Sequence, residues 1–151
     1  MIKILFVCHG NICRSTMAEF VMKDLVRENK EDYMIASAAT SREEIGNDTH
    51  RGTKRMLDKH HIPYTRRAAR VMTKEDYDSY DFLIGMDEAN ISNMIRICNG
   101  DPENKIHTLL SYTHRKGVIA DPWYSGNFEE TYKDVVEGCL ALKDYIQENR
   151  M

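Results

Sequence analysis

The sequence predicts a doubly wound α/β domain, in which helices cover both faces of a parallel sheet. Three observations lead to this prediction. The chain begins with a nearly continuous apolar run, residues 2–7, of the kind found in strands that are buried on both faces. Segments with a helical period alternate with further apolar runs along the chain. No repeat, low-complexity tract or linker divides the 151 residues, so we expect a single domain over residues 1–151.

Four apolar segments are the predicted strands, and the first of them lies at residues 2–7. The others lie at residues 33–38, 82–86 and 105–110. Crossovers between parallel strands are right-handed, which brings the carboxyl ends of the strands to one edge of the sheet. Ligands of such sheets bind at that edge, so we expect the functional site at the loop after the first strand.

The segments between the strands carry helical patterns. The first helix is predicted by a periodic set of apolar residues within 17–25, with Glu19 among the charged residues of the opposite face. Further helices are expected over residues 49–60 and 87–97, and a helical turn is expected at residues 73–77. The clearest pattern is the apolar stripe formed by Phe128, Tyr132, Val135, Val136, Cys139, Leu142 and Ile146.

The composition is that of a soluble globular protein and excludes several classes. Lys and Arg number 21 against 24 Asp and Glu, so the net charge of −3 gives no general attraction to nucleic acid or to an anionic membrane. No apolar run is long enough to span a bilayer, and the N-terminal run is too short for a signal peptide. The cysteines lack the spacing of a small disulfide scaffold, so we expect reduced thiols and a cytoplasmic location. They are Cys8, Cys13, Cys98 and Cys139.

The loop after the first strand contains the first group of candidate functional residues. It reads Cys8-His9-Gly10-Asn11-Ile12-Cys13-Arg14-Ser15. A loop of this length can curl so that its backbone N–H groups, from His9 to Cys13, converge on a tetrahedral anion. The positive end of the following helix adds to the attraction. Gly10 and Asn11 are residue types that tolerate the left-handed backbone angles of such a curl.

The same positive field acts on Cys8 and favours its thiolate form, which is a strong nucleophile beneath a bound phosphorus atom. Arg14 offers a planar fork that can hold two phosphoryl oxygens at once. Ser15 has two readings that the local sequence leaves open: its hydroxyl stabilises the sulfur of Cys8, or it caps the helix.

A second motif lies late in the chain and supplies a carboxylic acid. It reads Ala120-Asp121-Pro122-Trp123-Tyr124. Displacing an alcohol or phenol from phosphorus requires a proton for the leaving oxygen, and Asp121 is the best candidate to donate it. Pro122 restricts the backbone at Asp121 and so fixes the direction of the carboxyl group. Trp123 and Tyr124 offer aromatic surfaces at the rim, and we expect one of them to face the site.

These motifs resemble the signature of the low-molecular-weight protein tyrosine phosphatases, and the resemblance covers essentially the whole chain. The family's loop, Cys-x-Gly-Asn-Ile-Cys-Arg-Ser, matches residues 8–15, and its late Asp-Pro-aromatic-aromatic element matches residues 121–124. Residues 37–41, 73–76 and 86–88 also look like family sequence. The resemblance implies a three-layer fold of the phosphotyrosine phosphatase I type, with a four-stranded parallel sheet, helices on both faces, and no metal or cofactor.

The resemblance also implies a reaction. Cys8 is the implied nucleophile, Arg14 the phosphate clamp and Asp121 the general acid and base, in hydrolysis through a cysteinyl-phosphate intermediate. The implied substrate is a phosphotyrosine-bearing protein or a small aryl phosphate, and phosphate-like oxyanions are implied inhibitors. We expect a monomer or a weak dimer.

Further roles are implied for residues around the loop. Asn11 is implied to hold the shape of the loop through hydrogen bonds that involve Ser15 and Ser37. Cys13 matches a second family cysteine, which forms a reversible disulfide with the nucleophile under oxidation. We therefore predict that Cys13 protects Cys8 against over-oxidation.

Two residues depart from the family pattern. Eukaryotic members usually carry an aromatic residue in the loop after the second strand, where it packs against one face of the substrate ring. This chain has Glu43 at that position, which does not provide this aromatic surface and would repel acidic phosphopeptides. His9 lies at a variable position of the phosphate loop, and we favour a contact with the substrate rim over a solvated side chain.

Four other functions are alternatives to a protein tyrosine phosphatase. An arsenate reductase needs two further relay cysteines, and residues 82–97 contain none. In protein arginine phosphatases the position of Ile12 is a threonine, so Ile12 favours phosphotyrosine, while Glu43 keeps this alternative open. A non-catalytic phosphate-binding module requires neither a thiolate nor an acid, so the presence of both argues against it. A phosphocysteine carrier does not require a general acid such as Asp121.

Overall fold

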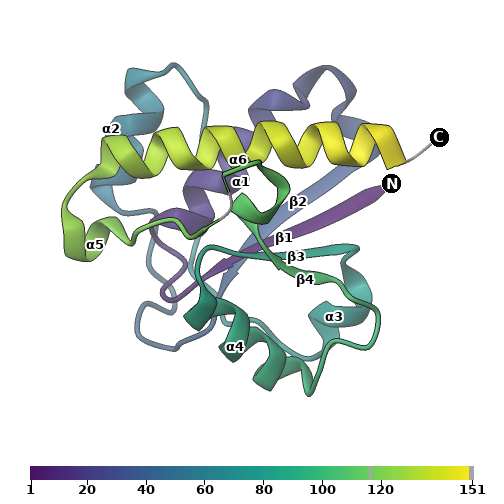
Figure 1. The fold of residues 1–151 in the computed structure, drawn as a ribbon. Helices are drawn as coiled ribbons and strands as arrows, with labels where there is room; N and C mark the ends of the chain where they lie inside the picture. The colour runs from purple at the N-terminus through teal and green to yellow at the C-terminus, as the bar shows by residue number, and fades with distance from the viewer. Residues whose placement is uncertain (116, 150–151) are drawn as a thin grey trace.

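A four-stranded parallel sheet lies at the centre of the computed structural model, which describes residues 1–115 and 117–149 (Figure 1). The strands run in the order β2-β1-β3-β4, so the first strand of the chain is an inner strand. Their bounds are β1 (Ile2–Cys8), β2 (Tyr33–Ala39), β3 (Phe82–Gly85) and β4 (Ile106–Thr108). The predicted fold class is therefore confirmed, and the positions of the first three strands agree with the apolar runs to within one residue.

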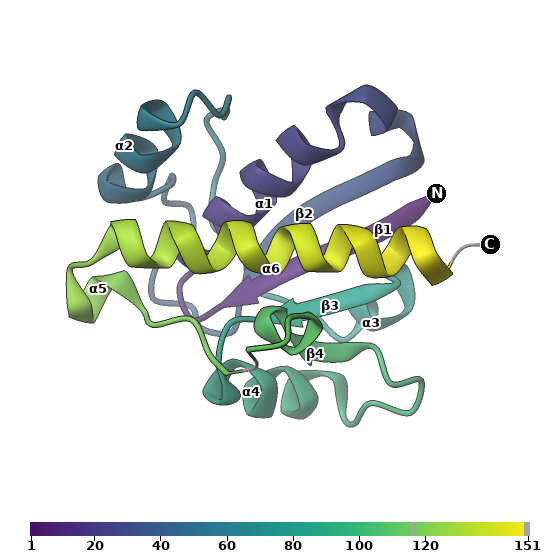
Figure 2. The ribbon, with the colours of Figure 1, turned by 45° about the horizontal axis from the view of Figure 1, so that its top comes forward.

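Helices cover both faces of the sheet, as Figures 1 and 2 show from two directions. One face carries α1 (Arg14–Leu25), α2 (Arg51–Lys59) and α6 (Phe128–Asn149). The other face carries α3 (Glu75–Ser79) and α4 (Glu88–Cys98). Three short helices were not predicted: η1 (Arg27–Asp32), η2 (Leu109–Tyr112) and α5 (Pro122–Ser125).

The side chains of β1 explain why this strand is apolar throughout. Successive side chains of a strand point to opposite faces of the sheet. Ile4 and Phe6 pack in the core beneath α1 and α6, whereas Leu5 and Val7 pack in the core that includes residues of α4. All four side chains have no exposed surface. A strand in this position must be apolar on both faces.

The fourth strand is shorter than predicted. The apolar run at residues 105–110 predicts a strand over its whole length, but β4 ends at Thr108 and η2 begins at Leu109. Leu109 and Leu110 are buried within the same core as residues of α6, and η2 packs against that helix. Their apolar character therefore reflects burial against a helix and not pairing in the sheet.

The charged face predicted for α1 is correct at Lys23, which is exposed, and wrong at Glu19, which is buried. This helix contacts β1, β2, α2 and α6, and every residue from Arg14 to Met22 is buried. Glu19 lies opposite the apolar stripe of the helix, yet only 8% of its surface is exposed. Its carboxylate accepts a hydrogen bond from Ser37 Oγ at 2.5 Å and pairs with Lys23 Nζ at 2.6 Å. A charge in a helix that is covered on several sides requires such partners.

The carboxyl ends of the strands meet at one edge of the sheet, as predicted. Cys8 pairs with Ala39, the last residue of β2, and Val7 pairs with Gly85, the last residue of β3. The loops that leave these strands therefore begin side by side at this edge. None of the helices within residues 1–115 and 117–149 is long and apolar enough to cross a membrane.

Candidate active site

The loop between β1 and α1 has the curled backbone that the sequence predicts. Of the two residues expected to allow left-handed angles, Asn11 adopts them, with φ of 60°, whereas Gly10 does not have a positive φ. The residue before α1 is Cys13, whose side chain makes no capping hydrogen bond to the helix. The N–H groups of the first turn, which lack partners within the helix, are therefore not capped by that side chain and can serve an anion. The loop is thus built as an anion site at the positive end of a helix.

Cys8 lies at the base of this loop and contacts Ser15. Its side chain is 3% exposed, and its Sγ atom is 3.0 Å from Ser15 Oγ. Asn11 Nδ2 donates a hydrogen bond to the same oxygen at 2.8 Å. Because Asn11 occupies a lone pair of Ser15 Oγ, the hydroxyl proton is free to point at a Cys8 thiolate. Of the two readings of Ser15, the geometry fits the contact with sulfur, since Ser15 lies inside α1 and is not its cap.

Arg14 is almost fully buried and is held by an acid and a carbonyl. It is 2% exposed, and its Nη1 donates to Asp87 Oδ2 at 2.7 Å and to Ile119 O at 2.8 Å. Its Nη2 is 3.5 Å from Asp121 Oδ2. Its Nε is buried without a hydrogen-bond partner among the described residues. A buried N–H without an acceptor costs free energy, and a bound oxyanion would supply that acceptor.

The sequence did not identify Asp87 as a residue of the site. Asp87 follows β3 and caps α4, because its Oδ1 accepts from the backbone N–H of Asn90 at 2.8 Å. Its other oxygen holds Arg14, so one carboxylate fixes both a helix and the guanidinium. The signal was an acidic residue directly after a strand, at the carboxyl edge of the sheet.

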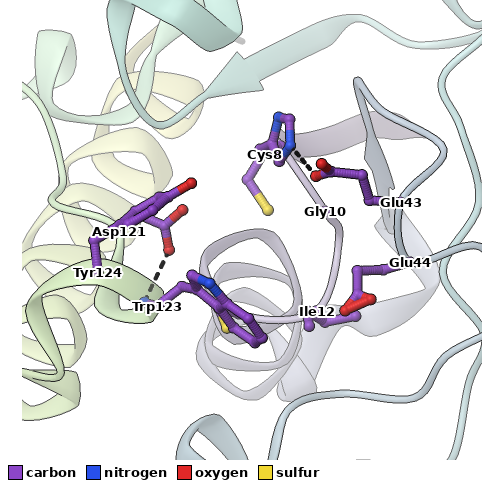
Figure 3. A pocket seen from close by; sticks show the side chains of 10 residues that line it. Cys8, Gly10, Ile12, Glu43, Glu44, Asp121, Trp123 and Tyr124 are labelled. Carbon is purple, nitrogen blue, oxygen red and sulfur yellow. Dashed lines mark hydrogen bonds and ion pairs between the residues drawn. The ribbon is translucent and has the colours of Figure 1, made fainter.

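Asp121 and the two aromatic residues lie across the cavity from the loop after β2 (Figure 3). Asp121 precedes α5, and its Oδ1 accepts from the backbone N–H of Trp123 at 3.1 Å. This bond and Pro122, the first residue of α5, fix the carboxyl group at the mouth. Trp123 and Tyr124 both line the cavity, where the sequence led us to expect one, and both are exposed.

The cavity has a volume of about 260 Å³ and is open above Cys8. His9 lines the cavity with an exposed side chain, and its imidazole pairs with the Glu43 carboxylate. The sequence did not identify Glu44, which also lines the cavity and closely approaches Gly10, so that a Cβ atom at Gly10 would lie 3.3 Å from its Cγ. The full lining is Cys8, His9, Gly10, Ile12, Cys13, Glu43, Glu44, Asp121, Trp123 and Tyr124.

The network around Asn11 differs in part from the implied one. Asn11 contacts Ser15, but Ser37 donates its hydroxyl to Glu19. The oxygen of the Asn11 amide instead accepts hydrogen bonds from the guanidinium of Arg67 and from the backbone N–H of Arg70. Ser37 is therefore a hydrogen-bond partner of the buried Glu19. The hydrogen bonds that position Asn11 come instead from two arginines of a loop distant in the sequence.

Cys13 lines the same cavity as Cys8, and its thiol is also buried. Burial raises the pKa of the Cys13 thiol to about 12, and the neighbouring Cys8 and Asp121 add to this rise. Cys13 is therefore a neutral thiol at physiological pH. Within residues 1–115 and 117–149, no group of three or more His, Cys, Asp or Glu side chains could hold a metal ion.

The fold and this site together define a phosphatase. The family model for low molecular weight phosphotyrosine protein phosphatase matches residues 3–151. The chain therefore belongs to that family.

Individual relatives agree with this assignment. The low molecular weight protein-tyrosine-phosphatase PtpA of Staphylococcus epidermidis is 36% identical over 148 residues, which cover 97% of this chain and 94% of the relative. The crystal structure of YfkJ from Bacillus subtilis is 35% identical with a TM-score of 0.95, over 100% of this chain and 98% of that one. The Drosophila arginine phosphatase DARP is 28% identical with a TM-score of 0.84, over 99% of both chains.

Proposed function

We propose that this enzyme hydrolyses phosphotyrosine in proteins, and small aryl phosphates, through a cysteinyl-phosphate intermediate and without a metal ion. The observation that carries the proposal is the position of the buried Cys8 sulfur at the base of a cavity, between an anion-binding loop and the Asp121 carboxyl group. The exposed aromatic wall of Trp123 and Tyr124 suits a planar phenyl ring. The described part of one chain supplies all these groups, which fits a monomer or a weak dimer.

In the first step, the Cys8 thiolate attacks phosphorus and the bond from phosphorus to the phenolic oxygen breaks. Asp121 donates its proton to that oxygen, so that tyrosine leaves as a neutral phenol. The N–H groups of the loop and the Arg14 guanidinium stabilise the negative charge on the phosphoryl oxygens. The product is phosphocysteine, with the phosphoryl group bonded to Cys8 Sγ.

In the second step, water attacks the phosphocysteine and the sulfur–phosphorus bond breaks. The Asp121 carboxylate takes a proton from the attacking water, and inorganic phosphate is released. The Ser15 hydroxyl stabilises the departing Cys8 thiolate, which is 3.0 Å away. Since the cycle requires a reduced Cys8, we propose a cytoplasmic location. Phosphate-like oxyanions would occupy the loop and inhibit.

A second candidate activity is hydrolysis of phosphoarginine. Glu43 and Glu44 line the mouth of the cavity, where they could pair with the cationic part of a phosphorylated guanidinium. The similarity to an arginine phosphatase supports this candidate. Ile12 opposes it, because this residue lines the cavity with an apolar side chain that favours an aryl group.

Phosphate release from matched peptides carrying phosphotyrosine, phosphoarginine or phosphoserine tests the proposal. We expect kcat/KM for phosphotyrosine to exceed that for phosphoserine by about 10²-fold or more, since a phenolate leaves more easily and packs against aromatic side chains. A preference for phosphoarginine would establish the second candidate instead. No release from any peptide would leave a phosphate-binding module or a carrier.

Replacing Asp87 with asparagine is expected to lower kcat/KM by about 10- to 100-fold, because Arg14 loses a charged hydrogen-bond partner. Asparagine can still cap α4, so the melting temperature should change little. Steady-state hydrolysis of an aryl phosphate and thermal unfolding measure the two effects. Asp81→Asn is the control, because Asp81 accepts from Lys3 N at the opposite end of β3. Unchanged activity of Asp87→Asn would mean that Ile119 O and Asp121 position Arg14 without the charge of Asp87.

Treatment with peroxide is expected to produce a disulfide between Cys8 and Cys13. Peroxide converts the Cys8 thiolate to a sulfenic acid, and Cys13 then attacks that sulfur and releases water. Oxidation also removes the Cys8 charge, one of the causes that raise the pKa of Cys13. A thiol reductant should restore most of the activity of the parent enzyme. In Cys13→Ser, further peroxide should oxidise the unprotected sulfenic acid of Cys8 to a sulfinic acid, which the reductant does not reverse, so this variant should remain inactive.

Mass spectrometry of the peroxide-treated enzyme identifies the linked peptides. Cys98→Ser is the control, since Cys98 lies at the end of α4 and does not line the cavity. Absence of the Cys8–Cys13 link, together with absence of recovery in the parent, would contradict the prediction.

A further inference from the structure

We propose that Arg67 is a positioning residue of this active site, which orients Asn11 and favours the thiolate of Cys8 without touching the substrate. Arg67 is not among the residues that line the cavity. The inference rests on the proposed function in that Cys8 must be a thiolate to attack phosphorus. Arg67 would thus be a second fixed cation, in addition to Arg14, that supports the phosphate-binding loop.

Arg67 is anchored at both its backbone and its guanidinium. Its backbone N–H donates to Asp48 Oδ1 at 3.1 Å, and its Nη1 donates to the carbonyl of Asn47 at 3.2 Å. The segment around it is tied to the loop after β2, because Ala69 N donates to Asn47 O at 2.7 Å. These hydrogen bonds therefore fix the position of Arg67. Its Nη2 is left to donate to the Asn11 amide oxygen.

A continuous chain of hydrogen bonds leads from Arg67 to the sulfur. Asn11 accepts from Arg67 through Oδ1 and donates through Nδ2 to Ser15 Oγ at 2.8 Å. Ser15 Oγ is 3.0 Å from Cys8 Sγ. A cation on the oxygen side of an amide polarises it and makes its N–H a stronger donor. Because the Ser15 oxygen accepts this hydrogen bond, its own proton points toward Cys8 and can be donated to a thiolate.

The charges that face Arg67 leave it a cation. Burial lowers the pKa of its guanidinium, whereas Glu19, Asp48 and Cys8 act in the opposite direction. Both carboxylates have cationic partners of their own: Glu19 pairs with Lys23, and Asp48 pairs with Lys54. An arginine with these neighbours stays protonated at physiological pH.

Arg67 and Arg14 contact different groups of the site. Arg14 is held by Asp87 and lies near Asp121, and its Nε, which has no partner among the described residues, can donate to a bound phosphoryl group. Its charge is therefore shared with two acids and with the substrate. Arg67 reaches the sulfur through Asn11 and Ser15, so its support persists when Cys8 leaves phosphorus in the second step.

Alkylation of Cys8 by iodoacetamide tests this inference without any substrate. The comparison is between Arg67→Met and Arg66→Met, since both variants lose one positive charge and Arg66 is exposed. We expect Arg67→Met to slow alkylation about tenfold at pH 5.5, the effect of losing one nearby cation, and to match the parent at pH 9. Arg66→Met should match the parent at both pH values. Mass spectrometry confirms that the modified residue is Cys8.

Arg67→Lys keeps the charge without the planar fork, and its alkylation rate at pH 5.5 should lie within about threefold of the parent. Thermal unfolding checks that each variant is folded. Equal rates for the parent and Arg67→Met at pH 5.5 would overturn the inference, as would equal slowing at both pH values, which indicates a structural disturbance. A parent Cys8 no more reactive at pH 5.5 than a cysteine in a short peptide would also overturn it. Failure of phosphotyrosine hydrolysis with these rates as expected would instead remove the proposed function.

Discussion

Replacing Cys8 with serine is expected to lower kcat for an aryl phosphate by a factor on the order of 10⁵, the largest effect of any substitution considered. The loop and the Ser15 hydroxyl can stabilise a thiolate, but a serine hydroxyl in the same place keeps its proton at neutral pH. The backbone N–H groups and Arg14 are unchanged, so the affinity for an oxyanion should change by less than about threefold. Phosphate release and calorimetric titration with tungstate measure the two quantities.

Cys98→Ser is the matched control, because it makes the same exchange of sulfur for oxygen at a buried cysteine outside the cavity. Its activity should stay within about twofold of the parent. Acid quenching of the parent during turnover should also trap a phosphoryl group on the peptide that contains Cys8. Activity of Cys8→Ser near that of the parent, or a phosphoryl group on another residue, would refute the covalent route through Cys8.

The parts of this molecule that could be predicted from the sequence are those that depend on neighbouring residues. The loop from Cys8 to Ser15 is continuous, and a buried strand before it with a helix after it fixes its place at the edge of the sheet. Asp121 could be identified because Pro122 follows it and marks a constrained turn. Strand positions followed from apolar runs, which are long and unbroken where a strand is covered on both faces.

The parts that could not be predicted depend on contacts between distant residues. Asp87 and Arg67 lie 73 and 56 residues from their partners in the loop, and a lone charge beside a strand or in an irregular segment has many possible partners. Glu19 was misplaced for the same reason. Its helix is covered by the sheet on one side and by α6 on another, and only the tertiary structure reveals that Ser37 and Lys23 pair with it.

Replacing Asp121 with asparagine is expected to lower kcat for phosphotyrosine by about 10²- to 10⁴-fold, through loss of the general acid and base. Asparagine also caps helices well, so its side chain can still accept from Trp123 N and keep α5 in place. The variant should therefore fold and bind oxyanions as the parent does. Asp144→Asn removes the same charge from an exposed position on α6 and should leave kcat unchanged.

The leaving group separates the two roles of Asp121. A dinitrophenolate departs without a proton, so with dinitrophenyl phosphate the first turnover of Asp121→Asn should be nearly as fast as in the parent. Hydrolysis of phosphocysteine still lacks its base, so the phenol should appear in a burst of one equivalent per enzyme, followed by a slow steady state. With phosphotyrosine the first turnover itself should be slow. Equal slowing of the first turnover for both substrates would mean that Asp121 acts by positioning Arg14, 3.5 Å away, and not by donating a proton.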